Sequence, residues 1–123
     1  MNKKILIADD DRLLVRLIKT ALVKEGYEIK YAYDGATTLK LIKEFCPDVI
    51  VLDVMMPVLD GYKICQMINE NSQYNPIPKI IIATSRKSDI DKRISKIIGA
   101  DSFINKPYTP SELISKINEL LKK

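Results

Sequence analysis

The chain has no histidine and no tryptophan, and only two cysteines among its 123 residues. Without histidine it cannot supply a Ser-His-Asp or Cys-His catalytic set, a histidine-ligated zinc site or a phosphohistidine intermediate. Cys46 and Cys65 are far apart and form no CxxC pair, so we expect two reduced, partly buried thiols. Any chemistry must therefore use carboxylates, hydroxyls, lysine and the backbone.

Long apolar runs and dense blocks of one charge are also missing. The uninterrupted apolar stretches reach four or five residues, which is too short to span a membrane, and the N-terminus lacks the apolar core of an export signal. We therefore expect a cytoplasmic protein without a membrane partner. The lysines behind the net charge of +4 are scattered and form no basic–aromatic cluster, so we expect no direct nucleic-acid binding.

Short apolar runs alternate with segments of helical period along the whole chain. The predicted strands are residues 5–8, 28–33, 49–52, 80–83 and 102–105. The first, third and fourth are continuous apolar runs, as in central parallel strands, whereas the second alternates and fits an edge. A helix is expected after each strand. The sequence therefore predicts an α/β fold of flavodoxin-like type: a three-layer sandwich with a five-stranded parallel sheet of order 2-1-3-4-5 and five helices.

Capping residues and apolar stripes define the predicted helices. We expect Asp11 to cap the first helix, Gly26 to follow it, and Thr109 to open the last helix with a capping box. Asp60 and Gly61 are expected to form the loop and cap before the third helix, where Gly61 permits a positive φ. The predicted core stripes are Leu13, Leu14, Leu17, Ile18, Ala21 and Leu22; Leu39, Ile42 and Cys46; Ile64, Cys65 and Ile68; Ile90, Ile94, Ile97 and Ile98; and Leu113, Ile114, Ile117, Leu120 and Leu121.

Polar residues follow the predicted strands where each strand ends. Asp9, Asp10 and Asp11 follow the first strand, Asp53 the third, Thr84 the fourth and Lys106 the fifth. Ligands of open parallel sheets bind outside the carboxyl ends of the strands, so we expect these groups to converge at one edge.

This group of side chains has a defined chemical capacity. A site of oxygen ligands without histidine suits Mg²⁺, which takes one or two carboxylates and keeps several waters. Metal, ammonium and hydroxyl together can hold a phosphoryl group, and an aspartate in that setting can act as the nucleophile that receives it.

The segments ILIADDD, VLDVMMPVLDG, IIIATS and FINKP resemble, in order and spacing, the four signature regions of the receiver domains of bacterial two-component response regulators. The resemblance covers nearly the whole chain and implies one CheY-like receiver domain over residues 1–123. It implies a phosphoprotein in phosphorelay signalling that receives its phosphoryl group from a sensor histidine kinase or a histidine phosphotransfer protein. Such a domain is no enzyme beyond its own phosphorylation and dephosphorylation.

The resemblance also implies a role for each matching residue. Asp53 would be the phosphoacceptor, and Mg²⁺ would be held by Asp10, by Asp9 largely through water, by Asp53 and by the backbone carbonyl of Met55. The remaining implied roles are a mobile hydroxyl at Thr84, a phosphoryl-binding cation at Lys106, an aromatic switch at Phe103 and a cis peptide bond before Pro107.

Other functions and outputs stay open at this point. A haloacid-dehalogenase-type phosphatase also uses a strand-end aspartate with Mg²⁺, but it needs a second acid where this chain has Met55. A glycine- or hydroxyl-rich loop, as a nucleotide-binding flavodoxin-like module requires, is replaced by three aspartates. The chain is either a stand-alone receiver or a fragment of a larger regulator with a separate effector domain. We expect the output contact, with a partner or in a homodimer, on the predicted helix around residues 90–98, the strand at 102–105 and the predicted helix around residues 110–121.

Overall fold

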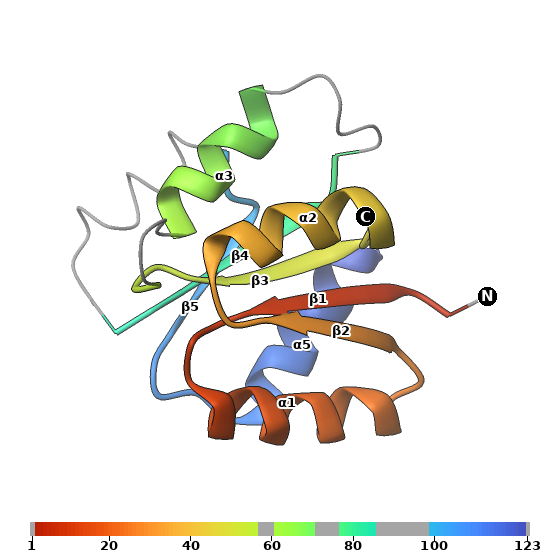
Figure 1. Cartoon of the computed structure of the whole chain (residues 1–123). Helices are drawn as coiled ribbons and strands as arrows, with labels where there is room; N and C mark the ends of the chain where they lie inside the picture. Colours follow the sequence, from red (N-terminus) through yellow and green to blue (C-terminus); the bar gives the residue numbers. More distant parts are fainter. Residues whose placement is uncertain (1, 57–60, 71–76, 86–98, 123) are drawn as a thin grey trace.

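The computed structural model describes residues 2–56, 61–70, 77–85 and 99–122 (Figure 1). Its strands all run parallel in one five-stranded sheet of order β2-β1-β3-β4-β5, which confirms the predicted flavodoxin-like topology. The predicted helix over residues 90–98 lies outside the described residues. In chain order the described elements are β1 Lys4–Ala8, α1 Arg12–Lys24, β2 Glu28–Ala32, α2 Gly35–Phe45, β3 Val49–Asp53, α3 Gly61–Glu70, β4 Lys79–Thr84, β5 Ser102–Asn105 and α5 Pro110–Leu121.

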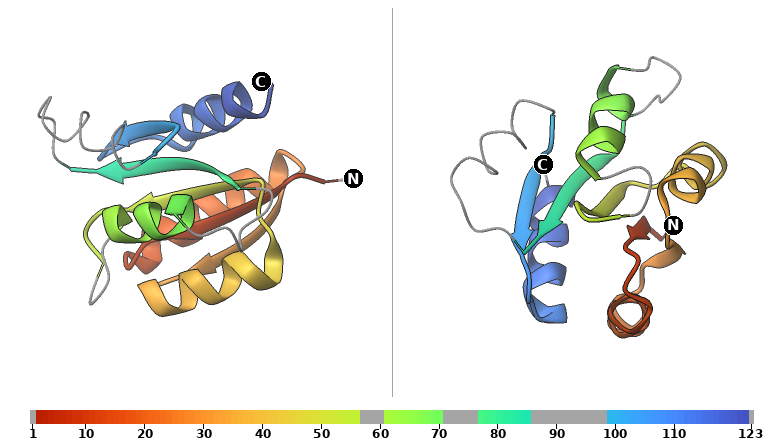
Figure 2. Two further views of the ribbon diagram at one scale, coloured as in Figure 1. Left: turned by 90° about the horizontal axis from the view of Figure 1, so that it is seen from above. Right: turned by 60° about the vertical axis from the view of Figure 1, so that its left-hand side comes forward.

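Helices lie on both faces of the sheet (Figure 2), and an apolar cluster fills the space between sheet and helices on each face. On one face, α1 and α5 pack against residues such as Ile5, Ile7 and Val51. On the other face, α2 and α3 pack against the alternate residues of the same strands, such as Leu6 and Leu52. Because successive side chains of a strand point to opposite faces, a continuous apolar run serves both layers. The central strands β1, β3 and β4 are therefore buried at every residue except Lys4 and Lys79 at their amino ends, and their carboxyl ends are held at fixed positions.

The predicted caps are present. The Asp11 carboxylate accepts a hydrogen bond from the backbone N–H of Leu14 at the start of α1, and Gly26 follows that helix with a φ of 93°. Thr109 and Glu112 form the reciprocal capping box of α5. No helix in the described part of the chain is long and apolar enough to cross a membrane.

The predicted core of two helices needs correction. Ile18 and Leu22 are buried as predicted, but Leu13 and Leu17 are 77% and 55% exposed, and α1 buries Val15, which the predicted stripe omitted. α1 carries more apolar side chains than one face can bury, so packing alone selects the buried set.

Cys46 is exposed rather than buried, since α2 ends at Phe45 and Cys46 is its C-cap in left-handed conformation. Phe45 enters the core in its place.

Candidate functional site

Two buried carboxylates lie side by side at the carboxyl edge of the sheet. Asp9 follows β1, and Asp53 is the last residue of β3, the strand that pairs with β1. Asp9 is 2% exposed and Asp53 is 4% exposed. Strand pairing fixes their separation, because Ala8 is in register with Leu52, one residue before each carboxylate. Buried carboxylates require a positive partner to remain charged.

Lys106 is that partner. Its ammonium group lies 2.7 Å from Oδ2 of Asp9 and 3.2 Å from Oδ1 of Asp53, and 21% of its side chain is exposed. The lysine is held there by β5, and its backbone N–H donates to the carbonyl of Thr84. The Lys106–Pro107 peptide bond is cis, as predicted. Lys106 thus contacts Asp9, a residue 97 positions away in the sequence.

The pKa shifts of Asp53 and Lys106 reflect an excess of negative charge at this site. Burial raises the pKa of the Asp53 carboxyl, the charge of Asp9 raises it further, and Lys106 only partly offsets both effects. For Lys106, burial lowers the pKa, but the hydrogen bond and charge of Asp9, followed by those of Asp53, raise it overall. The site therefore holds more negative charge than one ammonium group neutralises, which favours a further cation.

A cation has a suitable set of ligands here. Carboxylate oxygens of Asp9, Asp10 and Asp53 lie within 4.8 Å of one another, and Asp10 is exposed. In Asp9, Oδ1 accepts a hydrogen bond from the backbone N–H of Asp11, while Oδ2 accepts one from the ammonium group of Lys106. An all-oxygen set with one exposed carboxylate fits a hydrated Mg²⁺ ion. The backbone N–H of Met55 lowers the pKa of the Asp53 carboxyl, and the ligand role of the Met55 carbonyl stays a prediction.

The two predicted switch residues lie on neighbouring strands. Thr84 is the last residue of β4, is 4% exposed, and is in register with Asn105 of β5. Phe103 is partly buried against the apolar layer formed by α2 and α3. The structure thus brings Thr84 and Lys106 to the edge that carries Asp53, and places Phe103 further down β5.

Gly61 and Tyr108 are two site residues whose roles sequence reasoning missed. Gly61 does not use the positive φ that glycine permits. It is needed instead because a Cβ there would lie 2.4 Å from the backbone oxygen of Asp53. Tyr108 is buried beside the cluster, and its hydroxyl pKa is raised by burial and by the charges of Asp9 and Asp53. The KP motif immediately before Tyr108 was the only available signal for it.

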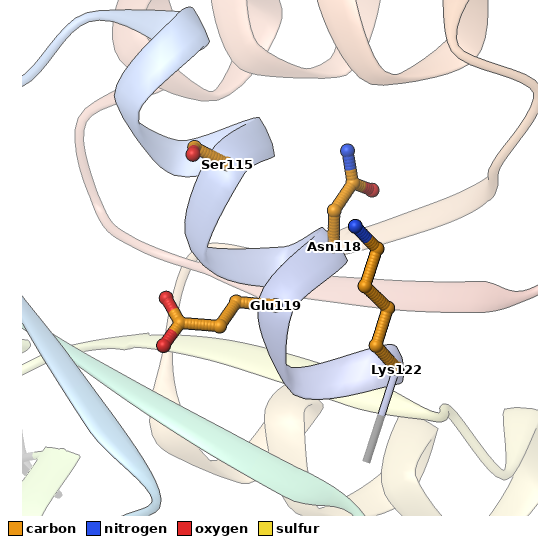
Figure 3. Close-up of a pocket in the computed structure, with 4 residues that line it drawn as sticks. All are labelled: Ser115, Asn118, Glu119 and Lys122. Atoms are coloured by element: carbon orange, nitrogen blue, oxygen red, sulfur yellow. The ribbon is translucent and has the colours of Figure 1, made fainter.

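A separate pocket lies along α5 (Figure 3), lined by Ser115, Asn118, Glu119 and Lys122. Asn118 accepts a hydrogen bond from the hydroxyl of Tyr27, which joins α5 to the segment before β2. The residues that line the α5 pocket do not include Asp9, Asp53 or Lys106, so the pocket has no part in the chemistry of those side chains.

Comparison with known proteins agrees with this geometry. The family model of the response regulator receiver domain matches residues 5–118. A curated relative from Bacillus subtilis, the alkaline phosphatase synthesis transcriptional regulatory protein PhoP, is 36% identical over 123 residues, which are 100% of this chain and 50% of the relative. The chain thus spans about half the length of that curated relative.

Solved structures show the same fold. The receiver domain of the Francisella response regulator 1452 is 36% identical, with a TM-score of 0.90 over 98% of each chain. The Vibrio cholerae chemotaxis protein CheY4 is 29% identical, with a TM-score of 0.89 over 97% of this chain and 98% of its own. With the family model covering nearly all of the sheet and helices, the chain belongs to the response-regulator receiver family.

Proposed function

We propose that Asp53 accepts a phosphoryl group from a sensor histidine kinase or a histidine phosphotransfer protein, in a reaction that depends on Mg²⁺. The observation that carries the proposal is the single ammonium group of Lys106, 2.7 Å from Asp9 and 3.2 Å from Asp53, at a strand edge with a third carboxylate on Asp10. Receiver domains of response regulators take part in phosphorylation-based signalling, and this arrangement supplies the groups that such a transfer needs.

In this reaction an ionised oxygen of Asp53 attacks the phosphorus of a phosphohistidine. A P–O bond forms, the P–N bond breaks, and the departing imidazole takes a proton from solvent. Lys106 keeps Asp53 ionised beforehand and provides positive charge for the phosphoryl oxygens afterwards. Asp9, Asp10, Asp53 and the Met55 carbonyl would hold Mg²⁺, which neutralises charge on the acceptor and the phosphoryl oxygens when bound.

The phosphoryl group adds close to two negative charges and three strong hydrogen-bond acceptors. Thr84 and Lys106 are the donors placed to follow it, from the ends of β4 and β5. We infer that Phe103 repacks when Thr84 moves, and that this repacking changes the surface formed by β5, α5 and the expected helix 4. Residues 90–98 of that expected helix lie outside the described part of the chain. That face would carry the output contact or a homodimer. The domain would have no enzymatic activity beyond its own phosphorylation and dephosphorylation.

The acceptor assignment is tested with acetyl phosphate, a small phosphodonor. We expect one phosphoryl group per chain in the presence of Mg²⁺, detected as a mass increase, and none after Asp53→Asn or with EDTA. Asp11→Asn is the matched control, because asparagine caps a helix as well as aspartate and Asp11 is a cap. Full labelling of the Asp53→Asn variant at the normal rate would refute the assignment, and labelling unaffected by EDTA would refute the metal dependence.

A further inference from the structure

We propose that Asn69 is a positioning residue, which holds the start of β5 in place relative to Asp53 and thereby opposes the change of state that follows modification of Asp53. The inference rests on the proposed function, since it concerns the response of this same site. Asn69 lies in the last turn of α3, the helix that begins at Gly61; α3 is labelled in Figure 1.

The amino-terminal end of α3, at Gly61, packs directly against the backbone of Asp53 and Val54. The backbone N–H of Gly61 donates to the carbonyl of Val54 at 3.2 Å, and there is no room for a Cβ between Gly61 and the backbone of Asp53. Further along, Ile64 and Ile68 are fully buried in the apolar layer. The helix thus has little freedom to move independently of Asp53.

The other end of α3 holds the segment before β5. The side-chain amide of Asn69 donates to the carbonyl of Cys65 at 2.9 Å and to the carbonyl of Gly99 at 3.3 Å. Gly99 has a φ of 94°, and a Cβ on it would lie 2.6 Å from the Asn69 amide. Only glycine therefore satisfies both the backbone conformation and the contact at position 99.

From Gly99 the chain leads back to the site. The backbone N–H of Asp101 donates to the carbonyl of Ile80, and its carboxylate accepts from the backbone N–H of Ile80, so this segment is anchored on β4. β5 then begins at Ser102 and ends one residue before Lys106, whose ammonium group contacts Asp53. Among the described residues, a closed path therefore runs from Asp53 along α3 and Asn69 to Gly99, and back along β5 to Lys106. Two of its contacts are made by side chains at its joints: that of Asn69 to Gly99 and that of Lys106 to Asp53.

Modification of Asp53 changes the second of these contacts directly. The first contact restrains the start of β5, and hence Phe103, in the unmodified state. We take the Asn69–Gly99 bond to be made in the unmodified state and lost in the modified state. A bond made in only one of two states favours that state by its own free energy. Loss of the Asn69 bond should therefore ease the change and raise the affinity for any ligand that stabilises the modified state.

The test uses beryllofluoride, a stable mimic of a phosphoryl group, with Mg²⁺. The chain has two phenylalanines, so fluorophenylalanine labelling gives one ¹⁹F signal from Phe103 and one from Phe45 on α2 as an internal reference. The variant is Asn69→Ala, which should keep the helix because Asn69 is exposed and alanine is the best helix former. Gln66→Ala is the matched control: Gln66 is also an exposed amide of α3, but it bonds to Glu70 of the same helix.

We expect Asn69→Ala to lower the beryllofluoride concentration at half-saturation about three- to tenfold, the range given by one ordinary hydrogen bond. The Phe103 signal of the unliganded variant should also move toward its liganded position, while Gln66→Ala leaves both unchanged. Gly99→Ala should act in the same direction, and the double variant should show less than the sum of the two effects.

An affinity of Asn69→Ala equal to that of Gln66→Ala, or weaker, would overturn the role of Asn69. Strict additivity of Asn69→Ala and Gly99→Ala would do so as well, because the two changes would then act through separate contacts. Failure of the unsubstituted protein to bind beryllofluoride would instead overturn the proposed phosphoacceptor function.

Discussion

Replacing Lys106 by methionine tests whether this lysine neutralises the strand-end carboxylates. Methionine keeps most of the length and apolar contact of the side chain but removes the charge. Asp9 and Asp53 would then face each other without a cation, with 3% and 5% of their side chains exposed. Removing one partner of a fully buried ion pair costs about 3–5 kcal/mol. Because 21% of the Lys106 side chain is exposed, we expect a loss of about 2–3 kcal/mol in the free energy of unfolding.

Mg²⁺ should restore part of this loss. An ion that binds only the folded state stabilises it by about 1.4 kcal/mol at ten times its dissociation constant. The ion should also bind more tightly to the variant, because Lys106 no longer competes for the same carboxylates. The gap between the variant and the unsubstituted protein should therefore narrow as Mg²⁺ rises.

The assay is urea unfolding followed by far-ultraviolet circular dichroism, with and without Mg²⁺. Lys40→Met is the control, since Lys40 is an exposed lysine of α2. Lys106 is protonated at neutral pH, because its pKa in the folded protein is raised above the ordinary value of 10.5. Its stabilising contribution is fully present below pH 10.5 and is lost only as the pH rises through the raised pKa. A loss no larger than that of Lys40→Met, or one that Mg²⁺ leaves unchanged, would refute the reasoning.

Three further predictions follow from the same site. The pKa of Asp53 is raised in the folded state, so its negative charge destabilises the metal-free protein at pH values above the ordinary pKa of 3.8. Asp53→Asn should therefore be more stable than the unsubstituted protein at pH 7 and lose that advantage toward pH 4. Urea midpoints whose difference grows at low pH would contradict this. Gly61→Ala should cost about 1–3 kcal/mol by overpacking and slow labelling by acetyl phosphate, whereas Gly26→Ala, strained only by its own φ, should label at the normal rate; equal labelling of the two would show that the contact with Asp53 is unimportant. Asp10→Asn should weaken Mg²⁺ binding in an NMR titration more than Asp11→Asn, and equal weakening would refute the distinction between ligand and cap.

Local patterns in the sequence determined most of the fold and the composition of the site. Runs such as Ile80–Ala83 predict buried parallel strands because both faces of such a strand are covered. Parallel strands end at a common edge, so the positions of Asp9, Asp53 and Lys106 after their strands were sufficient to predict that they converge. The caps at Asp11 and Thr109 depend on hydrogen bonds within four residues and were equally predictable.

Features that depend on the partner of an element were decided only by the tertiary structure. The apolar residues of α1 allow several rotations, and packing on the sheet buries Val15 while leaving Leu13 and Leu17 exposed. Gly61 is required by the backbone of Asp53, a contact that has no local signature.

The pairing of Lys106 with both buried carboxylates and the bond from Asn69 to Gly99 likewise join segments that are distant in the sequence. Periodicity states which residues are able to be buried, since it reflects the geometry of a single element. The surfaces that meet are chosen by the close packing of the whole domain, and only the three-dimensional structure records that choice.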